Sequence, residues 1–288
     1  MHKIIFFGNG ELAEYALAVL ERECQVILHA RTREDLTGAV EAKRTTPEAT
    51  AVLASFGVLI PSSVLEAFEP EGILNIHPSA LPLYRGASPI ESAILDGASE
   101  FAVSVMKLVK AMDAGPIYWQ KRFSGAEICA NVNTEANSKV AGAGNAAPVS
   151  EVLPGLPSDK RAIYRVLAEA GAEWISAHLG ELPEPVAQDD AKATFCGKFE
   201  KKDGVLTPLT ETREEILRKI VAFSGFPKVK CAVFGHSCAI LVAHIPDEGE
   251  RAVLTLECAD GPLAIDFLQP DGRKVMDAKA FVNGYGKV

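Results

Sequence analysis

The sequence predicts an α/β protein in which a parallel, helix-flanked sheet is followed by a small β-barrel domain. The first part of the chain alternates apolar runs with amphipathic helical patterns, which is the order of β-α-β units. The last part contains short apolar runs divided by Gly, Pro and Asp turns, a pattern typical of small barrels. With 288 residues, of which 48% are hydrophobic and 23% charged, the chain can build two globular cores.

The opening stretch KIIFFGNGELAEYALAVL predicts a strand, a tight turn and an amphipathic helix. A dinucleotide-binding site is the alternative interpretation of this turn. However, Gly8-x-Gly10 lacks the third glycine of that fingerprint, and Glu11 would face the pyrophosphate. We therefore interpret the two glycines as a tight turn of an α/β fold.

Further elements follow in order along the chain. Strands are predicted at QVILHA, TAVLASFG, GILNI and FAVSVMKLV, and helices at SSVLEAF and ASPIESAIL. Ser158 can cap a later helix that directs Val166 and Trp174 inward. Near the C-terminus, Thr212-x-x-Glu215 predicts a capping box ahead of the helix ILRKIVAF, which precedes the strands of the second domain.

Composition also suggests domain boundaries. Residues 1–180 form the predicted first domain, within which residues 124–157 are rich in Ala, Asn, Gly and Ser and are expected to be a loop or insertion. Residues 181–195 are acidic, contain two prolines and are expected to be a linker. Residues 196–288 form the predicted second domain.

Charge and cysteine content exclude several classes of protein. The net charge of −9 is unfavourable for nucleic-acid binding, although the segment from Cys196 onward carries equal numbers of basic and acidic residues. The six cysteines contain no C-x-x-C pair, so free thiols are expected rather than disulfides or a metal site. No apolar run reaches the ~20 residues of a membrane span. A cytoplasmic, monomeric protein that contacts no membrane and holds no metal is expected.

Two polar residues interrupt the buried strand GILNIH. Asn75 and His77 are two residues apart, so their side chains point to the same face of the strand. Asp113 follows the end of a later strand. Alone, each has an ordinary interpretation as a turn residue or a satisfied polar group. Together, an amide, an imidazole and a carboxylate suit acyl-type transfer, in which an oxyanion is stabilised and a proton is moved.

The run NIHPSALPLYRGASPIESAILDG, followed by SVMKLVKAMDAGPI, resembles the signature of formyltransferases that use 10-formyltetrahydrofolate. The resemblance implies a Rossmann-like formyltransferase domain whose catalytic trio is Asn75, His77 and Asp113. It further implies that 10-formyltetrahydrofolate is the donor and that tetrahydrofolate is the product. The family's S-L-L-P-x-x-R-G element is matched here except that Ala80 replaces the usual Leu. The implied folate-binding residues are Phe56, Gly57, Val58, Leu59, Ile60, Ser79, Ala80, Leu81, Pro82, Val109, Lys110, Ala111 and Met112.

The C-terminal part, from TFCGKFEKKDGVL to LAIDFLQPDGRKVMDAKAFVNGYGKV, resembles the OB-like domain of methionyl-tRNA formyltransferases. The resemblance implies initiator methionyl-tRNA as a partner. The candidate tRNA contacts are Lys43, Arg44, Arg85, Lys201, Lys202, Lys228 and Lys230. For the pairs Lys201-Lys202 and Lys228-x-Lys230, a solvated surface is the alternative. The segment between the second and third predicted strands is shorter than in the family and lacks its basic loop. The resemblance places no counterpart for residues 124–157.

The resemblance therefore implies transfer of the formyl group to the amino group of methionine on initiator tRNA. Asn75 and His77 are expected to stabilise the oxyanion, and Asp113 to support His77 and proton transfer. One alternative keeps the chemistry and changes the acceptor to an amino-sugar nucleotide. Others are hydrolysis of formyltetrahydrofolate and a non-catalytic nucleotide-binding or tRNA-binding relative. A nicotinamide dehydrogenase is disfavoured by the incomplete glycine fingerprint.

Overall fold

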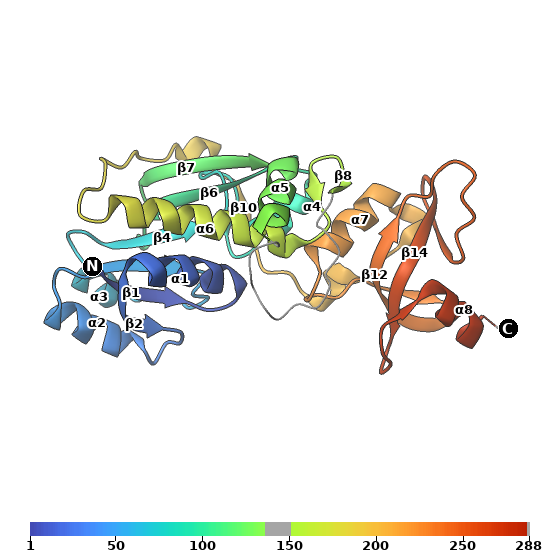
Figure 1. Cartoon of the computed structure of the whole chain (residues 1–288), viewed down its shortest axis with the longest axis horizontal. Coiled ribbons are helices and arrows are strands. Elements are labelled where there is room, and N and C mark those ends of the chain that lie inside the picture. The colour runs from blue at the N-terminus through green and yellow to red at the C-terminus, as the bar shows by residue number, and fades with distance from the viewer. Residues whose placement is uncertain (136–150, 287–288) are drawn as a thin grey trace. The chain divides into compact units, whose positions relative to one another are not determined.

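The computed structural model describes residues 1–135 and 151–286 (Figure 1). The chain divides into two compact units. The first contains Met1–Ile90, Arg161–Gly197 and the segment that begins at Glu100. The second contains the chain from Lys198 onward, together with Glu91–Ser99 and a short segment that ends at Lys160.

The first unit is built on a six-stranded sheet with the order β2-β1-β3-β4-β6-β7 (Figure 1). Strands β1 to β4 pair in parallel, whereas β6 runs antiparallel to β4 and β7 antiparallel to β6. The α/β class is confirmed, and two strands add an antiparallel edge to the predicted parallel sheet. The bounds are β1 Lys3–Gly8, β2 Gln25–Ala30, β3 Thr50–Ala54, β4 Ile73–His77, β6 Glu100–Lys107 and β7 Ile117–Ser124.

The antiparallel edge has a simple cause in the connection between β4 and β6. A parallel return needs a crossover helix that carries the chain back along the strands. The helix in this connection, α4 (Pro89–Leu95), has seven residues and rises only about 10 Å. The eight residues of β6 span about 26 Å.

Helices cover both faces of this sheet. On one face, Ile5, Phe7 and Ile73 belong to a core cluster that includes residues of α2 and the chain around α3. The ring of Phe7 contacts Phe56 and Phe68 edge to face, with centroids 5.8 and 5.6 Å apart. Figure 1 shows α1 and α6 in front of the sheet, on its other face. The bounds are α1 Glu11–Glu23, α2 Leu36–Thr45, α3 Ser62–Ala67, α5 Gly125–Glu135 and α6 Lys160–His178.

Helix α5 corrects one expectation, because its residues were predicted to be loop or insertion. Ser124 and Glu127 form a reciprocal cap at its start: the Ser124 backbone N–H donates to the Glu127 carboxylate, and the Glu127 N–H donates to the Ser124 hydroxyl. Ile128 and Cys129 are buried. The strands β8 (Glu151–Leu153) and β9 (Leu156–Pro157) pair in an antiparallel ladder. The remainder of the predicted insertion, residues 136–150, lies outside the described residues.

The second unit contains an antiparallel sheet with the order β11-β12-β14-β13, to which β15 is added on β14. The predicted capping box is present: Thr212 Oγ1 accepts from the Glu215 N–H, and the Glu215 carboxylate accepts from the Thr212 N–H. The bounds are α7 Arg213–Ala222, β11 Lys230–Val233, β12 His236–His244, β13 Thr255–Cys258, β14 Gly261–Pro270, β15 Met276–Asp277 and α8 Ala278–Tyr285. Short 3₁₀ turns occur in this unit at Lys201–Gly204 and Pro208–Thr210, and in the first unit at Asp190–Lys192.

The described residues also bear on the expectations for membrane spans, metal sites and cysteines. Within residues 1–135 and 151–286, no helix is long and apolar enough to cross a bilayer, and no three His, Cys, Asp or Glu side chains are grouped for a metal ion. The six cysteines are free thiols, as predicted. Burial, together with the neighbouring Cys238 and Cys258, raises the pKa of the Cys231 thiol to about 12. That thiol therefore stays protonated and unreactive at neutral pH.

Gly171 lies where α6 packs on the sheet. A β-carbon at this position would lie 2.8 Å from Cγ2 of Ile76 on β4 and 3.3 Å from Cγ2 of Val103 on β6. We expect Gly171→Val to lower the free energy of unfolding in urea by about 2 kcal/mol, because the added atoms overpack a closed core. Glu173→Ala, on the exposed face of the same helix, is the control. Unchanged stability of Gly171→Val would contradict this close packing.

Candidate functional site

Strand β4 carries the two polar residues of the predicted site. Its five residues are all buried, and Asn75 and His77 are each 5% exposed. Alternate residues of a strand point to the same face of the sheet, so Asn75 and His77 lie on the same face as Ile73. Ile73 is a residue of the core cluster. His77 is the last residue of the strand and lies opposite Ser104 of β6. The Asn75 side chain makes no hydrogen bond within the described part of the chain, so its amide can bind a ligand.

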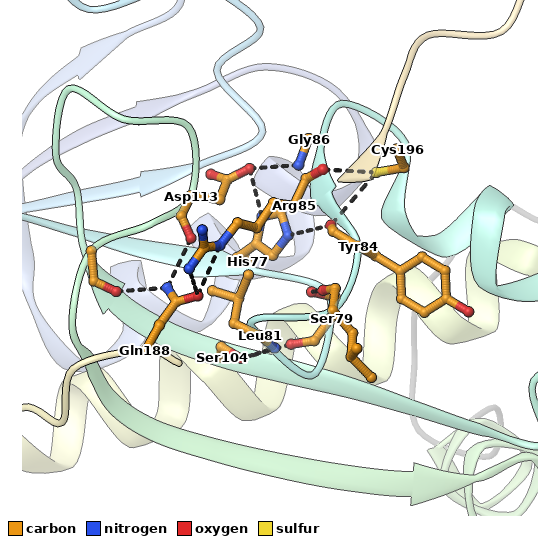
Figure 2. A network of polar contacts seen from close by, with 12 residues as sticks. His77, Ser79, Leu81, Tyr84, Arg85, Gly86, Ser104, Asp113, Gln188 and Cys196 are labelled. Carbon is orange, nitrogen blue, oxygen red and sulfur yellow. Dashed lines mark hydrogen bonds and ion pairs between the residues drawn. The ribbon is translucent and has the colours of Figure 1, made fainter. Parts of the chain in front are cut away.

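His77 lies between two oxygen atoms, one from the segment that follows it and one from the Asp113 loop (Figure 2). Its Nε2 is 3.1 Å from the carbonyl oxygen of Tyr84, and its Nδ1 is 3.7 Å from Oδ2 of Asp113. A carbonyl only accepts, so Nε2 carries a hydrogen and Nδ1 is the nitrogen that can exchange a proton. The Nδ1–Oδ2 distance exceeds that of a direct hydrogen bond.

Asp113 lies beside His77 because the loop after β6 folds back along β4. Strand β6 ends with Lys107 opposite Leu74, near the amino end of β4, and the Leu108 N–H donates to the Ile73 carbonyl. The loop of residues 108–116 must therefore extend back along β4 to bring Asp113 beside His77. Asp113 does follow the end of a strand, as predicted, but that strand is antiparallel to β4 and its end lies away from His77. The folded-back loop after this strand brings the two groups together.

Two backbone features hold the Asp113 carboxylate in place. Its Oδ2 accepts the backbone N–H of Gly86 at 2.8 Å. Asp113 itself adopts a left-handed conformation with φ of 48°, which Asp tolerates better than most residues. Tyr84 shares this conformation, with φ of 56°. For an aromatic residue it is strained and must be held by its surroundings.

Glycines allow the chain to approach itself closely at this site. A β-carbon on Gly86 would lie 2.0 Å from the carbonyl oxygen of Cys196, and one on Gly115 would lie 1.8 Å from that of Lys107. Backbone atoms cannot give way to such contacts. The glycines of the Arg-Gly and Asp-x-Gly elements are therefore required by packing, whatever further role their neighbours have.

Ser104 organises the segment that follows His77 and was missed in the sequence. It is fully buried, its Oγ donates to the Ser79 carbonyl at 2.6 Å, and it accepts from the Leu81 N–H at 3.2 Å and from Gln120 Nε2 at 2.9 Å. Gln120 Nε2 also donates to the Leu81 carbonyl. Nothing local in SVMK or YWQK marks these residues, because their partners lie 16 to 39 positions away in the sequence.

The predicted linker is not a free connection. Val186 and Ile117 exchange two backbone hydrogen bonds of 2.8 Å, and β10 (Phe195–Cys196) pairs with β5 (Arg85–Gly86). Gln188 donates to the carbonyls of the Asp113 loop. Most of residues 181–195 therefore pack as part of the first unit, beside the site.

Two of the predicted tRNA contacts, Arg85 and Lys43, are engaged in hydrogen bonds within the protein. Arg85 is 4% exposed, and its guanidinium donates to Gln188 and Asp190, so it is not available to phosphates. The Lys43 side chain is 11% exposed, and its Nζ donates to the carbonyls of Pro47 and Ala49. It closes the turn between α2 and β3 instead.

The other basic candidates lie at the surface and remain predictions. Arg44 and Lys202 are exposed and pair with neighbouring glutamates. Lys230 pairs with Asp271, and Lys228 donates to Gln269. Lys201 is exposed.

The predicted folate-binding residues fall into three segments around the end of β4. The segment after β3 has Phe56 and Ile60 buried in the core cluster, whereas Leu59 is 82% exposed and Gly57 has a positive φ of 71°. In the loop before Asp113, Met112 is 62% exposed. The remaining residues are the buried Ser79 and Leu81, the half-buried Val58, Ala80, Pro82 and Val109, and the exposed Lys110 and Ala111. Their contact with folate remains a prediction.

Comparison with known proteins supplies independent information. Residues 13–143 match the family described as Formyl transferase, and residues 198–286 match that described as Formyl transferase, C-terminal domain. The methionyl-tRNA formyltransferase of Granulibacter bethesdensis is 31% identical over 245 residues, which cover 82% of this chain and 68% of that protein. The enzyme of the same name from Thermus thermophilus is 30% identical over 267 residues, which cover 89% of this chain and 77% of that protein.

A solved structure shows the same fold. The crystal structure of HypX from Aquifex aeolicus in complex with tetrahydrofolic acid superposes with a TM-score of 0.68 at 18% sequence identity. The superposition covers all of this chain and 48% of that one, so this chain spans about half the length of HypX. At this identity the likeness concerns the fold alone.

The Ser104 network gives a prediction for stability. Ser104→Ala leaves the Ser79 carbonyl and the Leu81 N–H without their buried partner. We expect the free energy of unfolding to fall by about 1–3 kcal/mol, the cost of buried groups that lose a hydrogen bond. Chemical denaturation would measure this, with the exposed Ser63→Ala as the matched control. Equal stability of the two variants would contradict the network.

Proposed function

Because the chain belongs to the methionyl-tRNA formyltransferase family, we propose that it transfers the formyl group of 10-formyltetrahydrofolate to the amino group of methionine on initiator methionyl-tRNA. One observation carries the proposal. The three residues that match the family's catalytic motif are brought together by the fold: Asn75 and His77 share a strand face, and Asp113 lies 3.7 Å from the His77 ring.

The geometry suits attack by an amine on a formyl carbon. The free amino group of the methionyl ester attacks the carbon of the N10-formyl group, and the carbonyl oxygen becomes an oxyanion. The Asn75 amide, which has no protein partner among the described residues, and the Nδ1–H of protonated His77 donate hydrogen bonds to this oxygen. Neither a covalent enzyme intermediate nor a nucleophilic side chain is required.

Asp113 balances the protons of the reaction. It accepts a proton from the ammonium that forms on attack, and this proton is returned to N10 as the bond between carbon and N10 breaks. Its carboxylate also lies 3.7 Å from Nδ1 of His77, so it can pair with the ring when that nitrogen carries a proton. The Gly86 N–H keeps the carboxylate directed at the ring. The protein ends the cycle in its starting protonation state, with tetrahydrofolate and the formylated amine as products.

The folate ring is proposed to bind beside β4, between the segment of residues 56–60 and the loop before Asp113. Leu59 and Met112 support this placement, because a large apolar side chain that is mostly exposed gains from covering by a flat ring. Gly57 also supports it: no atom lies within 4 Å of a β-carbon built there, so a ligand can approach the backbone closely. The chemistry assigned to Asn75, His77 and Asp113 requires no metal ion.

A small acceptor, such as an amino-sugar nucleotide, is the second candidate. It is favoured by the loss of Arg85 and Lys43 as phosphate contacts in the first unit, since both are engaged within the protein. The match of residues 198–286 to the C-terminal formyltransferase domain, and the names of the relatives, favour tRNA.

The catalytic assignment predicts the effect of two substitutions. His77→Ala and Asp113→Asn are each expected to slow single-turnover formyl transfer by at least ~100-fold, because each removes a group that acts in the transition state. His2→Ala and Asp247→Asn change the same residue types at exposed positions and should retain wild-type rates. Near-normal turnover of either site variant would exclude its proposed role.

The acceptor is tested by supplying alternatives to the same enzyme. With 10-formyltetrahydrofolate as donor, we expect formylation of methionyl initiator tRNA at a kcat/KM at least ~10-fold above that for methionyl elongator tRNA. Amino-sugar nucleotides and water should be poor acceptors, measured as formylated sugar and as free formate. Faster reaction with an amino-sugar nucleotide would replace tRNA as the acceptor. Formate release without any amine would indicate a hydrolase.

A further inference from the structure

We propose that Gln188 is a positioning residue for Asp113 and that Arg85 holds the Gln188 side chain in the orientation this requires. The inference rests on the proposed function for the role of Asp113. It assigns a part in the reaction to a segment that the sequence marks only as a linker, and to an arginine expected to bind tRNA.

The Gln188 amide uses both of its ends. Its Nε2 donates to the carbonyl oxygens of Asp113 and Gly115, at 2.8 and 2.7 Å. Its Oε1 accepts from Nε and Nη2 of Arg85, at 3.0 and 2.8 Å (Figure 2). A guanidinium only donates and a carbonyl only accepts, so the amide has a single orientation that satisfies all four contacts.

These contacts form a closed cycle of hydrogen bonds that includes the Asp113 carboxylate. The Arg85 side chain holds Gln188, Gln188 holds the Asp113 and Gly115 carbonyls, and the Asp113 carboxylate accepts the N–H of Gly86, the residue after Arg85. Both the backbone and the side chain of Asp113 are therefore tied to the same dipeptide. This matters because Asp113 is in a left-handed conformation, in a loop that extends back along β4.

Arg85 is suited to hold the amide because it is itself fixed. It is 4% exposed, and its Nη2 pairs with Oδ1 of Asp190 at 2.7 Å, which offsets part of the cost of burying the charge. Its backbone is bound through β10, where the Arg85 N–H donates to the Thr194 carbonyl at 2.9 Å. The segment that supplies Gln188 is anchored on the other side of that residue by the Val186–Ile117 pair.

The test is Gln188→Glu, which keeps the shape and the Oε1 contact with Arg85. The second carboxylate oxygen would face two carbonyl oxygens and repel them, so the Asp113 loop should move. We expect kcat to fall by about 10- to 100-fold, the scale of an ~1 Å misplacement of a catalytic group. KM for folate and for tRNA should change less than about threefold. Gln25→Glu, at an exposed position of β2, is the charge-matched control and should behave as wild type.

A double-mutant cycle separates positioning from a general structural role. If Gln188 acts through Asp113, then Gln188→Glu should slow the Asp113→Asn variant by less than about twofold, because the group it positions is already lost. A full further loss in that background, or a loss of activity that merely follows the fraction unfolded at the assay temperature, would overturn the inference.

A crystal structure of Gln188→Glu supplies a readout that does not depend on the acceptor. We expect the Asp113 carboxylate to leave the Gly86 N–H and to move away from His77, while β4 stays in place. An unmoved Asp113 would overturn the positioning role. If wild-type enzyme fails to formylate methionyl initiator tRNA, the proposed function fails, whereas a displaced Asp113 in the variant would still establish the positioning.

Discussion

The approach of the Asp113 carboxylate to the His77 imidazole is the interaction on which the rest of this site depends. The two groups are 3.7 Å apart in a largely buried setting, with 14% of the Asp113 side chain and 6% of the His77 side chain exposed. A carboxylate removed from water is costly unless it is hydrogen-bonded and paired. The protein supplies one hydrogen bond, from the Gly86 N–H, and places the imidazole 3.7 Å away.

The surrounding network can be understood as the structure needed to keep that pair in place. On one side, fully buried Ser104 ties the segment after β4 to β6 and, through Gln120, to β7. On the other side, Arg85 and Gln188 tie the Asp113 loop to β5. Most acceptors in these networks are carbonyl oxygens, which cannot donate, so few other hydrogen-bonding arrangements would satisfy the same groups. Buried polar networks of this kind specify a unique arrangement when every member is satisfied.

Much of the fold was predictable because it follows from local patterns. The β-α-β start, the Thr212–Glu215 capping box and the shared face of Asn75 and His77 depend on spacings of two to four residues. The Ser124–Glu127 cap has the same local character and could have identified α5, but the Ala- and Asn-rich composition around it favoured a loop. The burial of Ile128 and Cys129 decided in favour of the helix.

The sequence by itself determined the two-domain order of the chain and which residues are proposed to carry the chemistry: the amide and imidazole on one strand face and the carboxylate in Asp-x-Gly. Only the tertiary structure decided how they are held. Arg85 became a buried support because Gln188 and Asp190, 103 and 105 positions away, lie against it. Contacts between residues so far apart in the sequence produce no local pattern. They depend on which distant segments the tertiary fold brings together.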